Sequence, residues 1–126
     1  MVLHGVGIDV VDVTRISRLL EARGGRFATR WFTPEEVAAC DTEPDRSRAF
    51  AERLAAKEAV WKALGVGGLS SPVPWRQIAV RSGDAPVVLT GGLAAVAAGL
   101  GPVHLDWVSV DGVSVAVAFV EAGSAG

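Results

Sequence analysis

Apolar and β-branched residues alternate with glycines and polar residues near both ends of the chain, a pattern typical of strands. Five runs of this kind predict strands: 2–11, 78–81, 87–89, 105–110 and 113–120. Asp111-Gly112, between the last two runs, is a strong signal for a two-residue hairpin turn. Residues 83–86 (Gly-Asp-Ala-Pro) predict a second turn, between the two short runs.

Two helices are predicted directly after the first strand. The first is capped by Asp12 or Thr14, runs to about Ala22 with its apolar residues at helical spacing, and is stopped by Gly24-Gly25. The second begins at Thr33-Pro34-Glu35-Glu36. Thr33 fits the N-cap, proline fits the first turn, and Glu36 completes a capping box.

The longest predicted helix covers about Ser47 to Leu64. It is rich in alanine, has no glycine or proline inside, and ends at Gly65, which fits a C-cap. A short alanine-rich helix is expected over 92–99. Strands and helices are therefore partly segregated along the chain, and the predicted class is α+β.

Composition narrows the class of protein. The chain has 126 residues, enough for one domain with its own core, and we expect a single domain over 1–126. The mean hydropathy of +0.37 suggests apolar surface buried between subunits. One cysteine, Cys40, and no apolar run long enough for a signal peptide or membrane span predict a cytoplasmic protein that does not associate with membranes. The net charge of −2 argues against nucleic-acid binding.

Charge is distributed unevenly along the first third of the chain. Five arginines lie between Thr14 and Arg30 against the single acid Glu21, and they are Arg15, Arg18, Arg23, Arg26 and Arg30. The next stretch, 33–45, carries only acidic charge. Such blocks form either solvated helix faces or a basic platform for an acidic partner, and the sequence leaves both interpretations open.

The long predicted helix carries the strongest chemical signal. Glu58 and Lys62 are four residues apart and therefore project from one face. This spacing also suits an ordinary surface ion pair. However, the neighbours are small or apolar, and the only two lysines among twelve basic residues, Lys57 and Lys62, both lie here. A lysine ammonium is a compact charge that can approach a phosphate, so we favour a functional site.

Asp9 is the second candidate, near the end of the first predicted strand, where a carboxylate is either a helix cap or a ligand. Two carboxylates from different elements suit Mg²⁺, which takes few protein oxygens and completes its shell with water and substrate phosphate. Gly65 and Gly67, just beyond Lys62, fit either a backbone that approaches a phosphate or only a helix C-cap and loop. Two histidines with one cysteine do not make a zinc site, and no Walker-type loop or nucleophile elbow is present.

These segments resemble a known family. Gly7-Ile8-Asp9, Phe32 to Glu36, and Arg53 to Gly65 are similar to the holo-acyl-carrier-protein synthase type of 4′-phosphopantetheinyl transferase. The resemblance continues through 83–91 and the final strands, so it covers nearly the whole chain. It implies that family's fold, an antiparallel sheet packed against a long central helix and shorter helices.

The resemblance also implies a reaction and its residues. The Mg²⁺-dependent enzymes of this family transfer the 4′-phosphopantetheine group of coenzyme A to a serine of an acidic acyl carrier protein, in fatty-acid or polyketide synthesis, and release adenosine 3′,5′-bisphosphate. They are typically homotrimers with sites between subunits. The implied catalytic residues are Asp9, Glu58 and Lys62, of which Asp9 and Glu58 bind the metal. The implied coenzyme A contacts are Lys62, Gly65, Gly67, Arg53 and His104, and the implied carrier-docking residues are Arg15, Arg18 and Arg23.

One stretch departs from the family pattern. Relatives usually carry a serine-x-serine-histidine run before the last strand, whereas residues 104–112 here contain no histidine after a serine. This difference leaves an alternative function open. A divergent relative would bind a carrier protein in a biosynthetic assembly line without transferring the group, or with reassigned chemistry.

Overall fold

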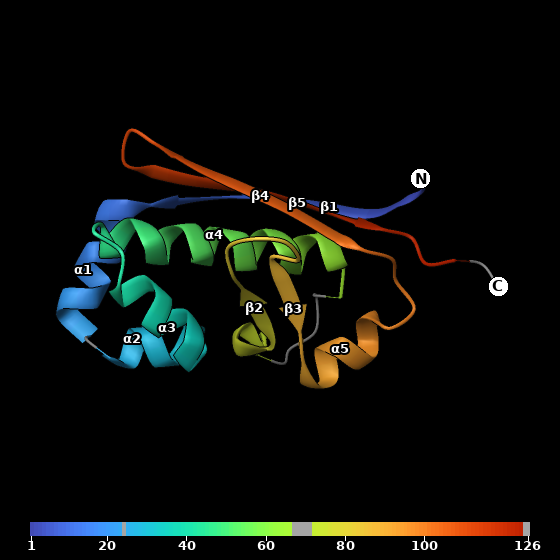
Figure 1. Cartoon of the computed structure of the whole chain (residues 1–126), viewed down its shortest axis with the longest axis horizontal. Coiled ribbons are helices and arrows are strands. Elements are labelled where there is room, and N and C mark those ends of the chain that lie inside the picture. Colours follow the sequence, from blue (N-terminus) through green and yellow to red (C-terminus); the bar gives the residue numbers. More distant parts are fainter. Residues whose placement is uncertain (24, 67–71, 125–126) are drawn as a thin grey trace.

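The long helix α4 (Arg46–Leu64) lies between two layers in the computed structural model, which describes residues 1–23, 25–66 and 72–124. On one side lies a three-stranded antiparallel sheet of order β1-β5-β4. On the other side lie the shorter helices and the two-stranded β2–β3 sheet (Figure 1). The α+β class and the antiparallel sheet packed on a long central helix are confirmed.

The remaining elements follow the chain in the order of their labels. They are β1 (Leu3–Asp12), α1 (Val13–Arg23), α2 (Gly25–Trp31), α3 (Pro34–Asp41), the 3₁₀ helix η1 (Trp75–Gln77), β2 (Ile78–Val80), β3 (Val87–Leu89), α5 (Gly91–Ala97), β4 (Val103–Val110) and β5 (Val113–Glu121). No helix in the described part of the chain is both long enough and apolar enough to span a bilayer.

Alanines let α4 be buried on several sides at once. Six of its alanines are at most 3% exposed, and they are Ala49, Ala51, Ala55, Ala56, Ala59 and Ala63. A helix that is apolar nearly all round belongs in a core, and short side chains allow neighbouring backbones to come close. The Asp45 side chain accepts from Arg48 N at 3.1 Å, and Gly65 closes the helix in the left-handed conformation with φ 69°.

Strand β1 makes the closest of these approaches. Its odd-numbered residues face α4, and a Cβ atom on Gly7 would lie 2.0 Å from the Ala59 carbonyl oxygen. A Cβ atom on Gly5 would lie 2.1 Å from the Ala63 carbonyl oxygen. Because the side-chain period of a strand is two, Asp9 is the next residue to face the helix.

The last two strands are joined as predicted. Asp111 and Gly112 both have positive φ, 52° and 77°, and Val110 pairs with Val113, which is the geometry of a two-residue hairpin. Val13 N donates to Gly112 O at 3.0 Å, so the hairpin tip is tied to the junction of β1 and α1.

The sequence prediction was wrong about the residues after Gly24. Gly25 begins a further helix, α2, although Gly24-Gly25 was expected only to end the preceding one. With seven residues and only Phe27 and Ala28 buried, α2 is too short to show helical periodicity. The predicted start of α3 is confirmed: Thr33 Oγ1 accepts from Glu36 N at 3.2 Å, and Glu36 Oε1 accepts from Thr33 N at 2.9 Å.

Candidate active site

Asp9, Glu58 and Lys62 meet where β1 crosses α4. The close packing of Gly5 and Gly7 on the helix holds Asp9 against this part of α4. Lys62 Nζ donates to Asp9 Oδ1 at 2.9 Å and to Ile8 O at 3.1 Å. The Asp9 side chain is only 14% exposed, whereas that of Lys62 is 53% exposed, so the cluster has a dry side and an open side.

The two carboxyl groups strongly affect one another. The pKa of Glu58 is raised to about 8, first by burial and then by hydrogen bonding to Asp9 and the negative charge of Asp9. The positive charges of Lys62 and Arg15 oppose this rise. Asp9 Oδ2 is buried without a hydrogen-bond partner. The site therefore favours either a proton on Glu58 or a cation between the carboxylates.

Glu58 also lines a pocket of about 560 Å³ formed with α1 and α2. Leu19, Phe27, Trp31 and Leu54 form its apolar part, and Arg15, Arg23, Arg26 and Arg30 form its basic part. Two of the predicted docking arginines, Arg15 and Arg23, thus line the pocket. Arg18 is exposed on α1 and does not line it. Four arginines beside an apolar surface suit an acidic partner with an apolar contact.

Sequence reasoning did not place Arg26, Arg30 and Trp31 at this pocket. All three belong to α2, the helix that was not predicted. The density of arginine between Thr14 and Arg30 was the only signal available. It does not show which surface these side chains line.

Arg53 and His104 lie at other places in the chain. Arg53 is 5% exposed and lines a cavity of about 410 Å³ together with Arg76 and Arg81, and its Nε has no partner. His104 lies on the outer face of the sheet, where its ring stacks on Phe119 and its Nε2 is 2.6 Å from Glu121 Oε2. A single chain therefore does not bring these two residues to Asp9, and their contacts with coenzyme A stay predictions.

The two glycines predicted to approach a phosphate follow Lys62. Gly65 is exposed at the end of α4, one turn of backbone beyond the lysine. Gly67 lies outside the described residues.

Lys57 does not belong to the chemical site. In the sequence it was counted together with Lys62 as a sign of a functional site on this helix. It is fully buried, and its Nζ lies 2.7 Å from Glu36 Oε1. It also donates to the carbonyl oxygens of Trp75 and Ile78. A compact ammonium is needed here because three acceptors converge on one point, which a planar guanidinium does not match.

Comparison with known proteins places the chain among related sequences and structures. The model of the 4′-phosphopantetheinyl transferase superfamily matches residues 5–113. A holo-[acyl-carrier-protein] synthase of Anaeromyxobacter dehalogenans is 44% identical over 124 residues, covering 93% of this chain and 94% of the relative.

Solved structures agree with the sequence relatives. The holo-[acyl-carrier-protein] synthase of Neisseria meningitidis matches with a TM-score of 0.83 and 29% identity, over 94% of this chain and 98% of that one. A holo-(acyl-carrier-protein) synthase of Bacillus anthracis, solved in complex with CoA (3′,5′-ADP), matches with a TM-score of 0.75 and 27% identity, over 98% and 100% of the two chains.

Proposed function

The chain belongs to the 4′-phosphopantetheinyl transferase superfamily, as its sequence motifs indicated, and we propose that it is a holo-acyl-carrier-protein synthase. It transfers the 4′-phosphopantetheine group of coenzyme A to a serine of an apo acyl carrier protein and releases adenosine 3′,5′-bisphosphate. The observation that carries this proposal is the meeting of Asp9, Glu58 and Lys62 beside a basic pocket, in a chain whose relatives are named for this activity.

Asp9 and Glu58 fit a Mg²⁺ ion. Asp9 Oδ2 is buried without a donor, and the pKa of Glu58 is raised by burial first and then by the adjacent Asp9 carboxyl group. A divalent cation between the two groups offsets both effects. Among the described residues no group of three or more His, Cys, Asp or Glu side chains is positioned to hold a metal. Two protein carboxylates are nevertheless sufficient for Mg²⁺ when a substrate phosphate completes the shell. When bound, the ion supplies positive charge that neutralises and orients the diphosphate of coenzyme A.

Each residue of the site then has its own role in the transfer. Glu58 lines the pocket through which the acceptor serine must approach, and its carboxylate accepts the proton of the serine hydroxyl. Lys62 Nζ is largely exposed and lies next to Asp9, where it stabilises the negative charge that develops on the departing bisphosphate. Arg15, Arg18 and Arg23 on α1 hold the acidic carrier protein over the pocket. Arg53, His104 and the Gly65–Gly67 segment contact coenzyme A.

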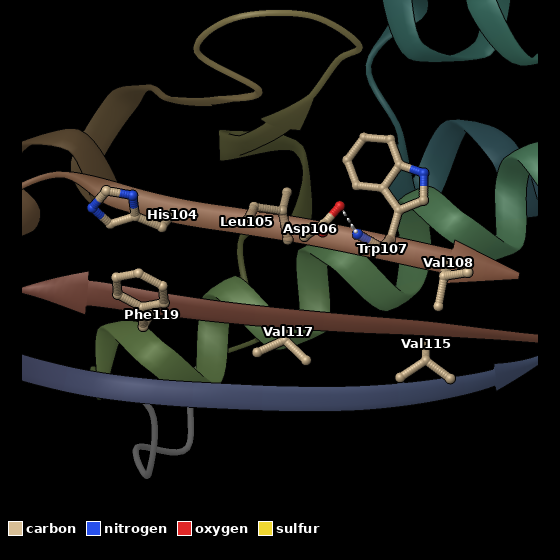
Figure 2. A pocket seen from close by; sticks show the side chains of 8 residues that line it. All are labelled: His104, Leu105, Asp106, Trp107, Val108, Val115, Val117 and Phe119. Atoms are coloured by element: carbon tan, nitrogen blue, oxygen red, sulfur yellow. Dashed lines mark hydrogen bonds between the residues drawn. The ribbon is translucent and has the colours of Figure 1, made fainter.

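We also propose a cytoplasmic homotrimer with the sites between subunits, supported by the outer face of the three-stranded sheet. Its even-numbered β1 residues and odd-numbered β5 residues form an apolar surface, with exposures of 53% at Val6, 55% at Ile8 and 58% at Val10. Figure 2 shows His104, Phe119, Val117, Val115 and Val108 on two of its strands, around a hollow of about 450 Å³. Apolar surface of this extent is typical of an interface between subunits. His104 lies on this face, so assembly through it would place His104 of one chain against a neighbouring chain.

Mass spectrometry of a carrier protein tests the activity. Incubation of an apo carrier protein with coenzyme A, Mg²⁺ and this protein should add the mass of one phosphopantetheine. Glu58→Ala should abolish the gain, whereas Glu43→Ala, a change at an exposed glutamate, should leave it intact. No transfer to any of several carrier proteins by a well-folded oligomer would refute the proposal, and retained carrier binding would then favour the non-transferring alternative.

Two further measurements test the metal and the assembly. Calorimetric titration with Mg²⁺ should give a binding isotherm that Asp9→Asn removes, and an unchanged isotherm would exclude Asp9 as a ligand. Light scattering should give a mass near three times the 13.0 kDa of one chain. Ile8→Lys should lower that mass to the monomer's, and a monomeric unaltered protein would contradict the trimer.

A further inference from the structure

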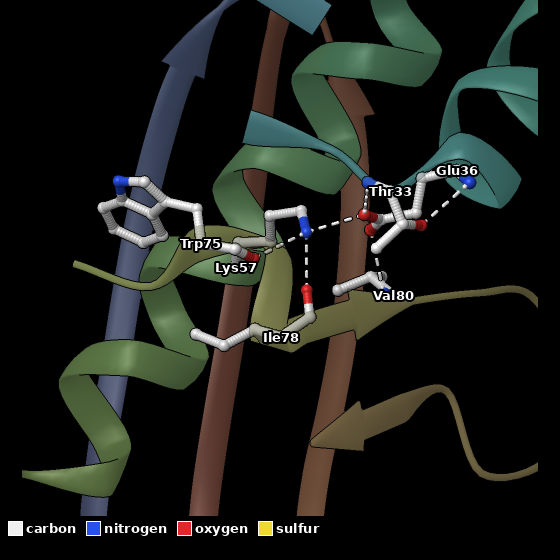
Figure 3. Close-up of polar contacts among 6 residues, drawn as sticks. All are labelled: Thr33, Glu36, Lys57, Trp75, Ile78 and Val80. Carbon is white, nitrogen blue, oxygen red and sulfur yellow. Dashed lines mark hydrogen bonds and ion pairs between the residues drawn. The ribbon is translucent and has the colours of Figure 1, made fainter. Parts of the chain in front are cut away.

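Lys57 and Glu36 form a buried ion pair that the proposed chemistry does not use. Glu36 is 3% exposed and Lys57 is fully buried. Glu36 Oε1 accepts from Lys57 Nζ at 2.7 Å and from Thr33 N at 2.9 Å, while Oε2 accepts from Val80 N at 2.9 Å. Lys57 Nζ also donates to Trp75 O at 3.0 Å and to Ile78 O at 2.5 Å (Figure 3). Every donor and acceptor of the pair is therefore satisfied, which is the condition under which a buried pair persists.

The pair is connected through Trp75 to Trp31, which forms part of one wall of the Glu58 pocket. Trp75, whose carbonyl Lys57 holds, stacks on Trp31 with ring centroids 4.7 Å apart and planes at 28°. Trp31 lines the pocket. The next residue along, Phe32, has its ring 5.4 Å from Lys57 Nζ, and the residue after it, Thr33, is bound through Glu36. Residues 31–33 are thus anchored by contacts that all lead back to the ammonium group of Lys57 and the carboxylate of Glu36.

Glu58 follows Lys57 directly on α4. Adjacent helical residues project about 100° apart. The Glu58 carboxylate therefore points into the pocket, while Lys57 points toward Glu36 and Trp75. The position of Trp31 relative to Glu58 is therefore set within a single turn of helix.

We propose that the Lys57–Glu36 pair is a positioning device that holds the Trp75–Trp31 stack in place and so shapes the carrier-protein subsite of the pocket. The inference rests on the proposed function, because it assigns the wall beside Glu58 to the acceptor. It predicts that loosening the pair weakens recognition of the carrier protein and leaves recognition of coenzyme A unaffected.

The test uses the paired substitution Glu36→Gln with Lys57→Met. Removing both charges together avoids leaving one charge buried without its partner, so the protein should fold. The circular-dichroism band that arises from coupled indole rings should weaken. The KM for the apo carrier protein should rise about fivefold, the scale of one aromatic pair. The KM for coenzyme A and kcat should each stay within about twofold.

Two other variants sharpen the outcome. Asp41→Asn with Arg46→Met neutralises an exposed ion pair in the same way and should change neither the indole band nor any KM. Trp75→Leu leaves the pair intact but removes the stack, so it should raise the carrier KM by a similar factor. Adding the Glu36→Gln and Lys57→Met changes to it should then give little further effect.

The proposal is overturned if the paired substitution keeps the coupled indole band, or if it loses the band with an unchanged carrier KM. An equal rise in both KM values would also overturn it, because that is the result of a general loss of structure. Absence of transfer by the unaltered protein would instead refute the proposed function. In that case the indole band alone decides whether the pair holds the stack.

Discussion

Gly7 allows a direct test of how the fold builds the site. Replacing it with alanine adds one methyl group at a point where the Cβ atom would lie 2.0 Å from Ala59 O, 2.9 Å from Ala59 C and 2.9 Å from Ala63 N. All three atoms belong to the α4 backbone and cannot rotate away. Since an ordinary carbon–oxygen contact needs about 3.3 Å, β1 must move away from α4 by roughly 1 Å.

The cost of that movement is estimated from overpacked cores. Forcing one extra carbon into a well-packed interior costs about 1–3 kcal/mol. For a domain of this size, that corresponds to a fall in Tm of roughly 4–12 °C. Because Asp9 is only two residues further along the same strand, its carboxylate moves relative to Glu58 and Lys62. A misplacement of about 1 Å at a reacting centre can lower a rate by about 100-fold.

Two assays check both consequences. Thermal unfolding should show the fall in Tm for Gly7→Ala, and phosphopantetheine transfer should fall by roughly two orders of magnitude at saturating substrates. Gly92→Ala is the matched control, because nothing lies within 4 Å of its added Cβ and α5 tolerates alanine. An unchanged Tm together with a transfer rate within about twofold of the unaltered protein would refute the reasoning.

Three further outcomes are expected. Burial raises the pKa of Cys40 to about 11, so Ellman's reagent at pH 8 should label it only after unfolding. Because its folded pKa exceeds the ordinary 9.0, its contribution to stability should be present below pH 9 and be lost toward pH 11, which urea titrations at several pH values measure. In protein treated with EDTA, the raised pKa of Glu58 penalises its ionised form, so Glu58→Gln should exceed the unaltered protein in urea resistance at pH 9, and the gap should narrow toward pH 6. Arg23→Glu should raise the KM for the carrier protein about tenfold at low salt and less at high salt, while Arg48→Glu, an exposed change on α4, should not.

Local signals explain which parts of the fold were predictable. The capping box at Thr33 and Glu36 and the turn at Asp111-Gly112 depend on residues within four positions of each other, and both were predicted correctly. The α4 helix was also predictable, to within one residue at its start, because it combines many alanines with a left-handed Gly65. In each of these segments the neighbours in sequence are the neighbours that decide the conformation.

Long-range contacts explain the rest. Glu36 and Lys57 are 21 positions apart, and no local pattern shows that a capping residue also neutralises a buried lysine. In the sequence, Gly5 and Gly7 only interrupt a β-branched strand pattern. The reason for them is the close packing of α4 against that strand, which the sequence does not show. The meeting of Asp9 with Lys62 was expected from chemistry and family resemblance, whereas its distance depends on this packing.

The apolar outer face of the sheet is also a hazard for a single chain in solution. Exposed valines and isoleucines lie in rows across this face, and β1 and β4 are the edge strands of the sheet. Such a surface favours aggregation by stacking of sheets from many chains. Asp106 interrupts these rows, exposed on β4 and in register with Val117 of β5. A carboxylate at that point makes flush, dry stacking of two sheets unfavourable, so it acts as a gatekeeper against aggregation during synthesis. An acid placed among these apolar residues thereby limits how closely separate chains can associate.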